Sequence, residues 1–235
     1  MEGNHLKTSQ DRSFYDFSTI IFDFDYTLVD SSKGAVESIN FALNELGLPK
    51  VKPEAINRTI GLSLEETFLA LAGQQHLTEY KKFRHFFIKR ADEVMTDLTN
   101  VYKSVPHVVK ELRNYGCKLA IFSSKFRYRI EAVLKRENLL SLFDIIVGWE
   151  DVSKSKPDPE GLLKKICRNL QVPPEKALYV GDTVTDAETA RRAGIPFVAV
   201  LSGVTSREDF SNYPIYSIIE DVTSLPKLIV KSNIT

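Results

Sequence analysis

The sequence predicts an α/β fold in which a doubly wound parallel sheet carries an inserted all-helical domain. The stretch that begins at Ser18 contains an apolar run, residues 20–22, that is typical of a buried strand. Residues 32–98 show helical spacing of apolar side chains and no strand pattern. From Val101 onward strands and helices alternate, which favours parallel strands joined by right-handed crossovers. We therefore expect a core domain of residues 1–31 and 99–235, with residues 32–98 as the inserted domain.

The inserted domain is expected to consist of helices with recognisable ends. Residues 32–46 place apolar side chains at near-helical spacing, and Gly47 follows as a C-terminal stop. Pro53 suits the first position of a second helix. Residues 63–66, Ser-Leu-Glu-Glu, have the form of a capping box that starts a third. A long charged and aromatic stretch, residues 78–97, predicts the last helix of the insert.

The core domain is expected to add five strands and four helices after the insert. The first of these helices stops at Gly116, and Asp158 with Pro159 supplies an N-cap and first position for a later one. The predicted strands are 117–122, 143–147, 177–180, 197–201 and 216–219, and the predicted helices are 105–115, 125–138, 158–170 and 183–193.

The composition narrows the class of protein. Lys plus Arg and Asp plus Glu both number 31, so there is no basic excess and we expect no nucleic-acid partner. No window has the roughly 18 consecutive apolar residues of a membrane span, and we expect no membrane partner. Cys117 and Cys167 lack metal or redox spacing and are expected to be reduced. These features predict a cytoplasmic protein. Both a monomer and a homodimer are compatible with the sequence.

Two carboxylates, Asp23 and Asp25, end the first predicted strand, and a hydroxyl follows at Thr27. Alternation along a strand would point both carboxylates the same way. Two like charges that close repel each other unless a cation or a proton lies between them. The stretch therefore indicates a metal site.

Polar side chains also follow the other predicted strands. Ser123 and Ser124 come after one strand, Asp182 and Asp186 after another, and a third strand leads to a loop that contains Lys156. The carboxyl ends of strands in an open α/β sheet collect at one edge, where ligands bind. We therefore expect these groups to meet there.

This set of groups favours phosphoryl chemistry. Asp23, the backbone carbonyl of Asp25 and Asp182 would suit Mg²⁺, which prefers a few oxygen ligands and completes its shell with water and phosphate. Lys156 and Ser123 would hold the phosphoryl group. Asp23 could then attack phosphorus, while Asp25 gives a proton to the leaving oxygen and later takes one from water.

These motifs, in this order, resemble those of the haloacid dehalogenase-like hydrolase superfamily. The insert resembles that superfamily's class I helical cap, and the resemblance covers about residues 16–230. Asp30-Ser31 after the first motif and the segment of residues 58–61 within the cap are most similar to the phosphoglycolate phosphatase-like branch. Together with this resemblance, the site favours a Mg²⁺-dependent phosphatase of a small phosphorylated metabolite as the leading hypothesis. We expect its cap to close over the site about hinges at 31–34 and 97–101.

The resemblance also implies residue roles. It makes Asp23 the nucleophile and Asp25 the acid and base, and it gives phosphate binding to Ser123 and Lys156. Metal binding falls to Asp23, Asp25 and Asp182, with Asp186 acting in support or through water. Ser124 and Arg58 are further candidates for substrate binding, although Arg58 could equally pair with a cap glutamate.

The chain departs from the family pattern in three places. Tyr26 stands where the family generally has Gly, which puts a hindered residue in the turn after the nucleophile and a ring near the substrate gate. Ser124 stands where Asn is common. Lys103-Ser104 replaces the usual Pro-Gly. None of these changes removes a catalytic group.

Other interpretations stay open at this point. A phosphomutase of the same superfamily would pass the phosphoryl group to a sugar hydroxyl, and a non-catalytic module would keep only the fold. Dehalogenation and phosphonate cleavage, for which Lys33 is the nearest lysine, are remote. The cap's Phe83, Phe86 and Phe87 predict a packed stripe. The cap also carries a basic face that we expect to be solvated and whose only expected role toward substrate is to attract anions to the cleft. Its residues are Lys81, Lys82, Arg84, Lys89 and Arg90.

Overall fold

The computed structural model describes residues 17–230 and contains a six-stranded parallel sheet in the order β5-β4-β1-β6-β7-β8. β1 lies near the middle and pairs with β4 on one side and with β6 on the other. This arrangement confirms the doubly wound α/β sheet. The strands are β1 Thr19–Phe22, β4 Lys118–Phe122, β5 Ile145–Val147, β6 Ala177–Gly181, β7 Phe197–Val200 and β8 Ser217–Ile219.

Each face of the sheet is covered by helices, because alternate strand residues point to opposite sides. Ile20 and Phe22 of β1 face a cluster built with α5 (Val105–Asn114), α6 (Arg127–Arg136) and α9 (Leu225–Val230). Ile21 faces the other cluster, which includes α8 (Val184–Ala193). Side chains in both clusters are almost wholly buried, which explains the continuous apolar character of the strands.

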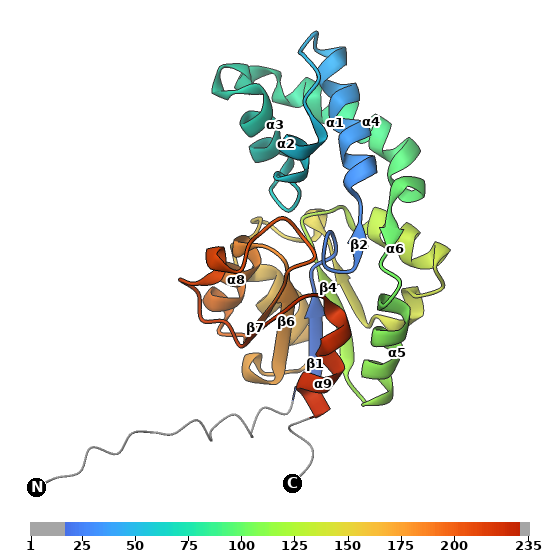
Figure 1. Cartoon of the computed structure of the whole chain (residues 1–235), viewed down its shortest axis with the longest axis vertical. Coiled ribbons are helices and arrows are strands. Elements are labelled where there is room, and N and C mark those ends of the chain that lie inside the picture. The colour runs from blue at the N-terminus through green and yellow to red at the C-terminus, as the bar shows by residue number, and fades with distance from the viewer. Residues whose placement is uncertain (1–16, 231–235) are drawn as a thin grey trace, which may run out of the picture.

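The insert forms a separate helical unit beyond the carboxyl ends of the strands (Figure 1). Its own apolar core includes Phe68 stacked on Phe83 at 4.4 Å between ring centroids. α1 and α4 pack closely at Gly34, where an added Cβ would lie 2.7 Å from Met95 Sδ. The four α-helices are α1 Ser32–Glu45, α2 Pro53–Asn57, α3 Leu64–Ala72 and α4 Tyr80–Leu98, and a 3-10 helix, Gln74–Glu79, precedes α4.

Most of the predicted helix ends are confirmed. Pro53 opens α2, and Ser63 with Glu66 forms the capping box of α3. Asp158 Oδ1 accepts a hydrogen bond from the Glu160 N–H at 3.0 Å, as an N-cap should. The helix that follows is π-helical over Gly161–Cys167 before α7 (Arg168–Leu170), and its periodicity alone did not predict the wider turns.

A short antiparallel ribbon joins the two domains and was missed in the sequence. β2 (Val29–Asp30) pairs with β3 (Asn100–Val101) where the chain enters and leaves the cap. Each strand has two residues, which is too short for a periodic signal. The ribbon lies within or beside the predicted hinges, so the cap is tied to the core by paired backbone. Within residues 17–230, no helix is long and apolar enough to span a membrane.

Candidate active site

The carboxyl edge of the sheet brings together the polar groups that follow β1, β4 and β6. The Lys156 ammonium lies at its centre, with Nζ 2.7 Å from Asp23 Oδ1 and 2.7 Å from Asp186 Oδ1. The side chains of Lys156 and Asp23 are only 4% and 6% exposed. A buried charge needs a partner, and here one cation serves two carboxylates.

Asp186 is held from three sides. Its Oδ2 accepts hydrogen bonds from the Thr183 N–H at 3.2 Å and Oγ1 at 2.5 Å, while its own N–H donates to Thr183 Oγ1 at the start of α8. The buried Tyr179 hydroxyl donates to Asp186 Oδ1 at 2.7 Å. Gly181 allows this packing, since a Cβ there would lie 2.7 Å from Asp186 Cγ. These contacts fix Asp186 and, through Lys156, the position of Asp23.

Three carboxylates fit a divalent metal. Asp23, Asp182 and Asp186 each present an oxygen within 4.8 Å of the others. Asp182 Oδ2 is buried and has no hydrogen-bond partner among the described residues, which is costly without a ligand. Oxygen-only donors of this kind suit a hard cation such as Mg²⁺. The Asp25 carboxylate lies outside this cluster, and the contact of its main-chain carbonyl with a metal stays a prediction.

Burial dominates the electrostatics of the cluster. It raises the pKa of Asp23 to about 7, with Lys156 opposing the shift and Asp186 adding to it. Burial also raises the pKa of Asp182 well above its usual range, reinforced by Asp23 and Asp186. Burial alone would lower the pKa of Lys156, but Asp186 and Asp23 outweigh it and raise that pKa instead. Without a metal, the cluster therefore holds protons near neutral pH.

Mg²⁺ is expected to stabilise the protein more at pH 8 than at pH 5.5, because protons compete for Asp23 below about pH 7. At a Mg²⁺ concentration about 100 times Kd, the gain in unfolding free energy should reach roughly 2.7 kcal/mol at the higher pH. Urea unfolding in EDTA and in Mg²⁺, at matched ionic strength, measures it. An equal or larger gain at pH 5.5 would contradict the assignment.

Asp25 has a different environment from Asp23. Its Oδ1 accepts hydrogen bonds from Ser31 Oγ at 2.6 Å and from Lys125 Nζ at 2.8 Å. The Lys125 side chain is only 8% exposed. Lys125 follows β4 by three residues, and its position at that strand end was the available sequence signal. The two aspartates thus have separate cations, which allows them separate chemical roles.

Tyr26 makes the turn between the aspartates and Thr27 with a φ of +59°, in the region that favours Gly. Its N–H donates to Val29 O at 2.7 Å, and its carbonyl accepts from Ser202 Oγ at 2.5 Å. The residue is 7% exposed and does not line the cavity that borders Asp23 and Asp25, so the predicted position of its ring at a substrate gate is wrong. Burial raises the pKa of Tyr26 to about 12, with Asp30 adding to the shift.

We expect Tyr26→Gly to destabilise the fold by about 2 kcal/mol, although Gly is the usual residue at this position in the superfamily that the sequence resembles. Relief of the positive φ should gain about 1 kcal/mol, whereas loss of a buried ring costs about 3 kcal/mol or more. Urea unfolding of both proteins tests this. A more stable variant would mean that backbone strain outweighs packing at this turn.

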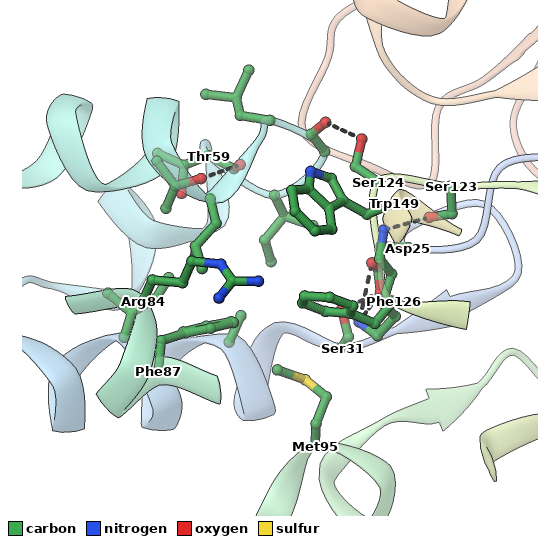
Figure 2. Close-up of a pocket in the computed structure, with 18 of the residues that line it drawn as sticks. Asp25, Ser31, Thr59, Arg84, Phe87, Met95, Ser123, Ser124, Phe126 and Trp149 are labelled. Atoms are coloured by element: carbon green, nitrogen blue, oxygen red, sulfur yellow. Dashed lines mark hydrogen bonds and ion pairs between the residues drawn. The ribbon is translucent and has the colours of Figure 1, made fainter. Parts of the chain in front are cut away.

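A cavity of about 110 Å³ lies between the cap and the core, and Asp23 and Asp25 both line it. Figure 2 shows Asp25 beside Ser123 at this cavity. Ser123 and Ser124 line it as predicted, and Ser124 Oγ also donates to the cap's Gly61 O at 3.3 Å. Lys156, Asp182 and Asp186 do not line it and lie in the buried cluster beside Asp23.

Arg58, a predicted substrate ligand, is exposed and does not line this cavity. Arg84, predicted to lie on a solvated face, lines it instead. Phe87 lines it too, whereas Phe83 is buried in the cap core as the packed stripe requires. Helical spacing does not say which of two faces of a cap helix turns toward the core, so it could not separate these outcomes.

Comparisons with known proteins point to the same superfamily that the sequence resembles. The family model for haloacid dehalogenase-like hydrolases matches residues 20–200. A phosphoglycolate phosphatase of Aquifex aeolicus is 33% identical over 78% of this chain and 84% of its own. The pyrophosphatase PpaX of Bacillus mycoides is 30% identical over 92% and 98%.

A solved structure gives the same result. A haloacid dehalogenase-like protein from Bacteroides fragilis superposes with a TM-score of 0.85 at 39% identity, over 89% of this chain and 99% of its own. The family match covers most of the sheet and the whole cap. It also includes the residues of the buried cluster in the core. The chain therefore belongs to the haloacid dehalogenase-like hydrolase family.

Proposed function

We propose that this hydrolase is a Mg²⁺-dependent phosphatase that acts on a small phosphorylated metabolite through an aspartyl-phosphate on Asp23. One observation carries the proposal: a buried carboxylate, ion-paired to Lys156 and within 4.8 Å of two more carboxylates, lines the cavity under the cap. The names of the Aquifex and Bacillus relatives, a phosphoglycolate phosphatase and a pyrophosphatase, support it.

The metal would be held by the carboxylates of Asp23 and Asp182 and the main-chain carbonyl of Asp25, with Asp186 supporting through Lys156 or water. When bound, Mg²⁺ supplies positive charge that neutralises and orients the phosphoryl group. The orphaned Asp182 Oδ2 would gain its missing partner.

In the first step a carboxylate oxygen of Asp23 attacks phosphorus, and the bond from phosphorus to the leaving oxygen breaks. Asp25 donates a proton to that oxygen as it leaves. Ser31 and Lys125 hold the Asp25 carboxyl in place for this transfer. Lys156, 2.7 Å from Asp23 Oδ1, and Ser123 place positive charge and a hydroxyl near the phosphoryl oxygens.

In the second step water attacks phosphorus, Asp25 takes its proton, and the bond from Asp23 to phosphorus breaks. The products are inorganic phosphate and the alcohol or acid of the leaving group, and both aspartates return to their starting states. The cap limits bulk water during the first step, because its loop at Gly61 contacts Ser124 across the cavity.

A hydrolysis screen tests the proposal. Phosphate release from a panel of phosphorylated metabolites is measured with Mg²⁺ and with EDTA, and at least one compound is expected to show metal-dependent release. Isomerisation of a hexose phosphate without phosphate release would instead identify the phosphomutase alternative. No reaction with any phosphoester in Mg²⁺ would identify the non-catalytic one.

A further inference from the structure

One cation at the cavity has no anionic partner. Arg84 comes from α4, and its guanidinium is directed into the cavity opposite Asp25 (Figure 2). Within residues 17–230 it forms no hydrogen bond and no ion pair. The Arg84 Cζ lies 5.5 Å from the ring centroid of Trp149 and 6.0 Å from that of Phe126, and both rings belong to the core.

Three other cations near the cavity are each paired with a carboxylate. Lys125 binds Asp25, Lys156 binds Asp23 and Asp186, and the buried Arg129 binds Asp92 of α4. A half-buried guanidinium keeps its charge, and loss of water around that charge is costly without an anion. Arg84 therefore differs from its neighbours in facing the cavity with its hydrogen-bond donors unused.

No group of the cap wall can supply the missing anion. The only carboxylates that line the cavity, among the described residues, are Asp23 and Asp25, and both have their own lysines. Apolar side chains form much of the cap side: Ala35, Ile39, Ile60, Leu62, Leu64 and Phe87. The complementary group must come from a ligand.

The cavity also limits what that ligand is. Its volume of about 110 Å³ is small beside the roughly 300–1,000 Å³ of pockets that hold drug-sized ligands, which favours a compact ligand. The hydroxyls of Thr59 and Thr67 face backbone carbonyls of the cap, at Ile56 and Thr59, and donate to them. A polyhydroxylated sugar would find few free partners here, whereas a compact anion would find Arg84.

We propose that Arg84 binds a second anionic group, a carboxylate or a phosphate, on the leaving group of a small phosphomonoester or diphosphate. This inference rests on the proposed phosphatase function and names its substrate class. The Phe126 and Trp149 rings belong to the core, so they hold the guanidinium in place only when the cap is closed. The anion site is therefore complete in the same state that covers Asp23.

The test compares substrates that differ only in that group. Phosphoglycolate and ethyl phosphate have leaving groups of similar size, one with a carboxylate and one with a methyl, and pyrophosphate offers a phosphate instead. The wild-type protein is expected to have a kcat/KM for phosphoglycolate or pyrophosphate at least tenfold above that for ethyl phosphate. Which anionic substrate is preferred distinguishes a carboxylate from a phosphate ligand.

Arg84→Gln should lower kcat/KM for the anionic substrate by roughly 10- to 100-fold, the range of a charge-assisted hydrogen bond, and leave ethyl phosphate within about twofold. Arg84→Lys should recover part of the lost kcat/KM, because it keeps the positive charge but lacks the paired N–H donors of the guanidinium. Lys82→Gln removes the same charge from an exposed position of α4 and should change neither substrate by more than about twofold.

Equal loss on both substrates in Arg84→Gln, or no wild-type preference for an anionic leaving group, would overturn the role of Arg84 and leave the phosphatase function intact. Hydrolysis of none of the three substrates by wild-type protein in Mg²⁺ would overturn this substrate class. Turnover of other phosphoesters in the wider screen would then show whether the proposed function survives without it.

Discussion

Asp23→Asn is expected to remove at least about 10³-fold of the Mg²⁺-dependent phosphatase activity, with little change in the fold. The amide is nearly the same size as the carboxylate but is a poor nucleophile, so no aspartyl-phosphate forms. Lys156 loses one of its two anions and keeps Asp186 at 2.7 Å, which maintains the ion pair on α8. The loss of the Asp23–Lys156 ion pair is partly offset, because the variant also removes one of the buried carboxylate charges that repel one another.

Two measurements check this expectation. Steady-state phosphate release gives kcat for both proteins, and intact mass after a rapid acid quench shows whether one phosphoryl group is attached to the wild type and not to the variant. Asp209→Asn, at an exposed site, is the matched control. Metal-dependent turnover that survives in Asp23→Asn would show that another group attacks phosphorus.

Lys156→Met is expected to lower the unfolding free energy by about 3–5 kcal/mol at pH 8 and to abolish turnover. The change leaves the buried Asp23 and Asp186 without their shared cation, and breaking a buried pair in this way exposes the cost of the unpaired charges. Methionine keeps much of the stem against the Phe122 ring, which Lys156 Nζ approaches to 5.1 Å from the centroid, so packing contributes little.

The loss should depend on pH with a definite sign. Burial already raises the pKa of Asp23 to about 7, and without Lys156 the pKa rises further. The folded variant then binds more protons than the unfolded chain above about pH 4, so its stability falls as pH rises. The difference in unfolding free energy between the wild type and Lys156→Met should therefore be smaller at pH 5 than at pH 8.

Urea unfolding at both pH values in EDTA tests the Lys156 prediction. Lys154→Met, in the same loop with a side chain 74% exposed, should change stability by no more than about 0.5 kcal/mol. Mg²⁺ should restore part of the lost stability, because it supplies positive charge beside Asp23. A loss that is equal at pH 5 and pH 8 would point to packing instead of charge.

The sequence by itself determined the parallel sheet, and it also predicts the helical insert and the meeting of the polar groups at one edge of the sheet. The apolar strands and the alternation after Val101 predict parallel crossovers, and parallel crossovers place all strand ends at one edge. The sequence therefore predicts that Asp23, Asp182 and Lys156 lie close together, although Lys156 is 133 residues from Asp23 along the chain. Local chemistry and general topology were sufficient for these assignments.

Only the tertiary structure decided which way individual side chains turn. It turned Arg84 into the cavity and left Arg58 outside, paired Asp25 with Lys125, and buried the Tyr26 ring away from the cavity. Each outcome depends on packing between segments far apart in sequence, such as α4 against Phe126 and Trp149. Periodicity gives the face that a residue occupies within its own element, and it carries no information on what that face meets.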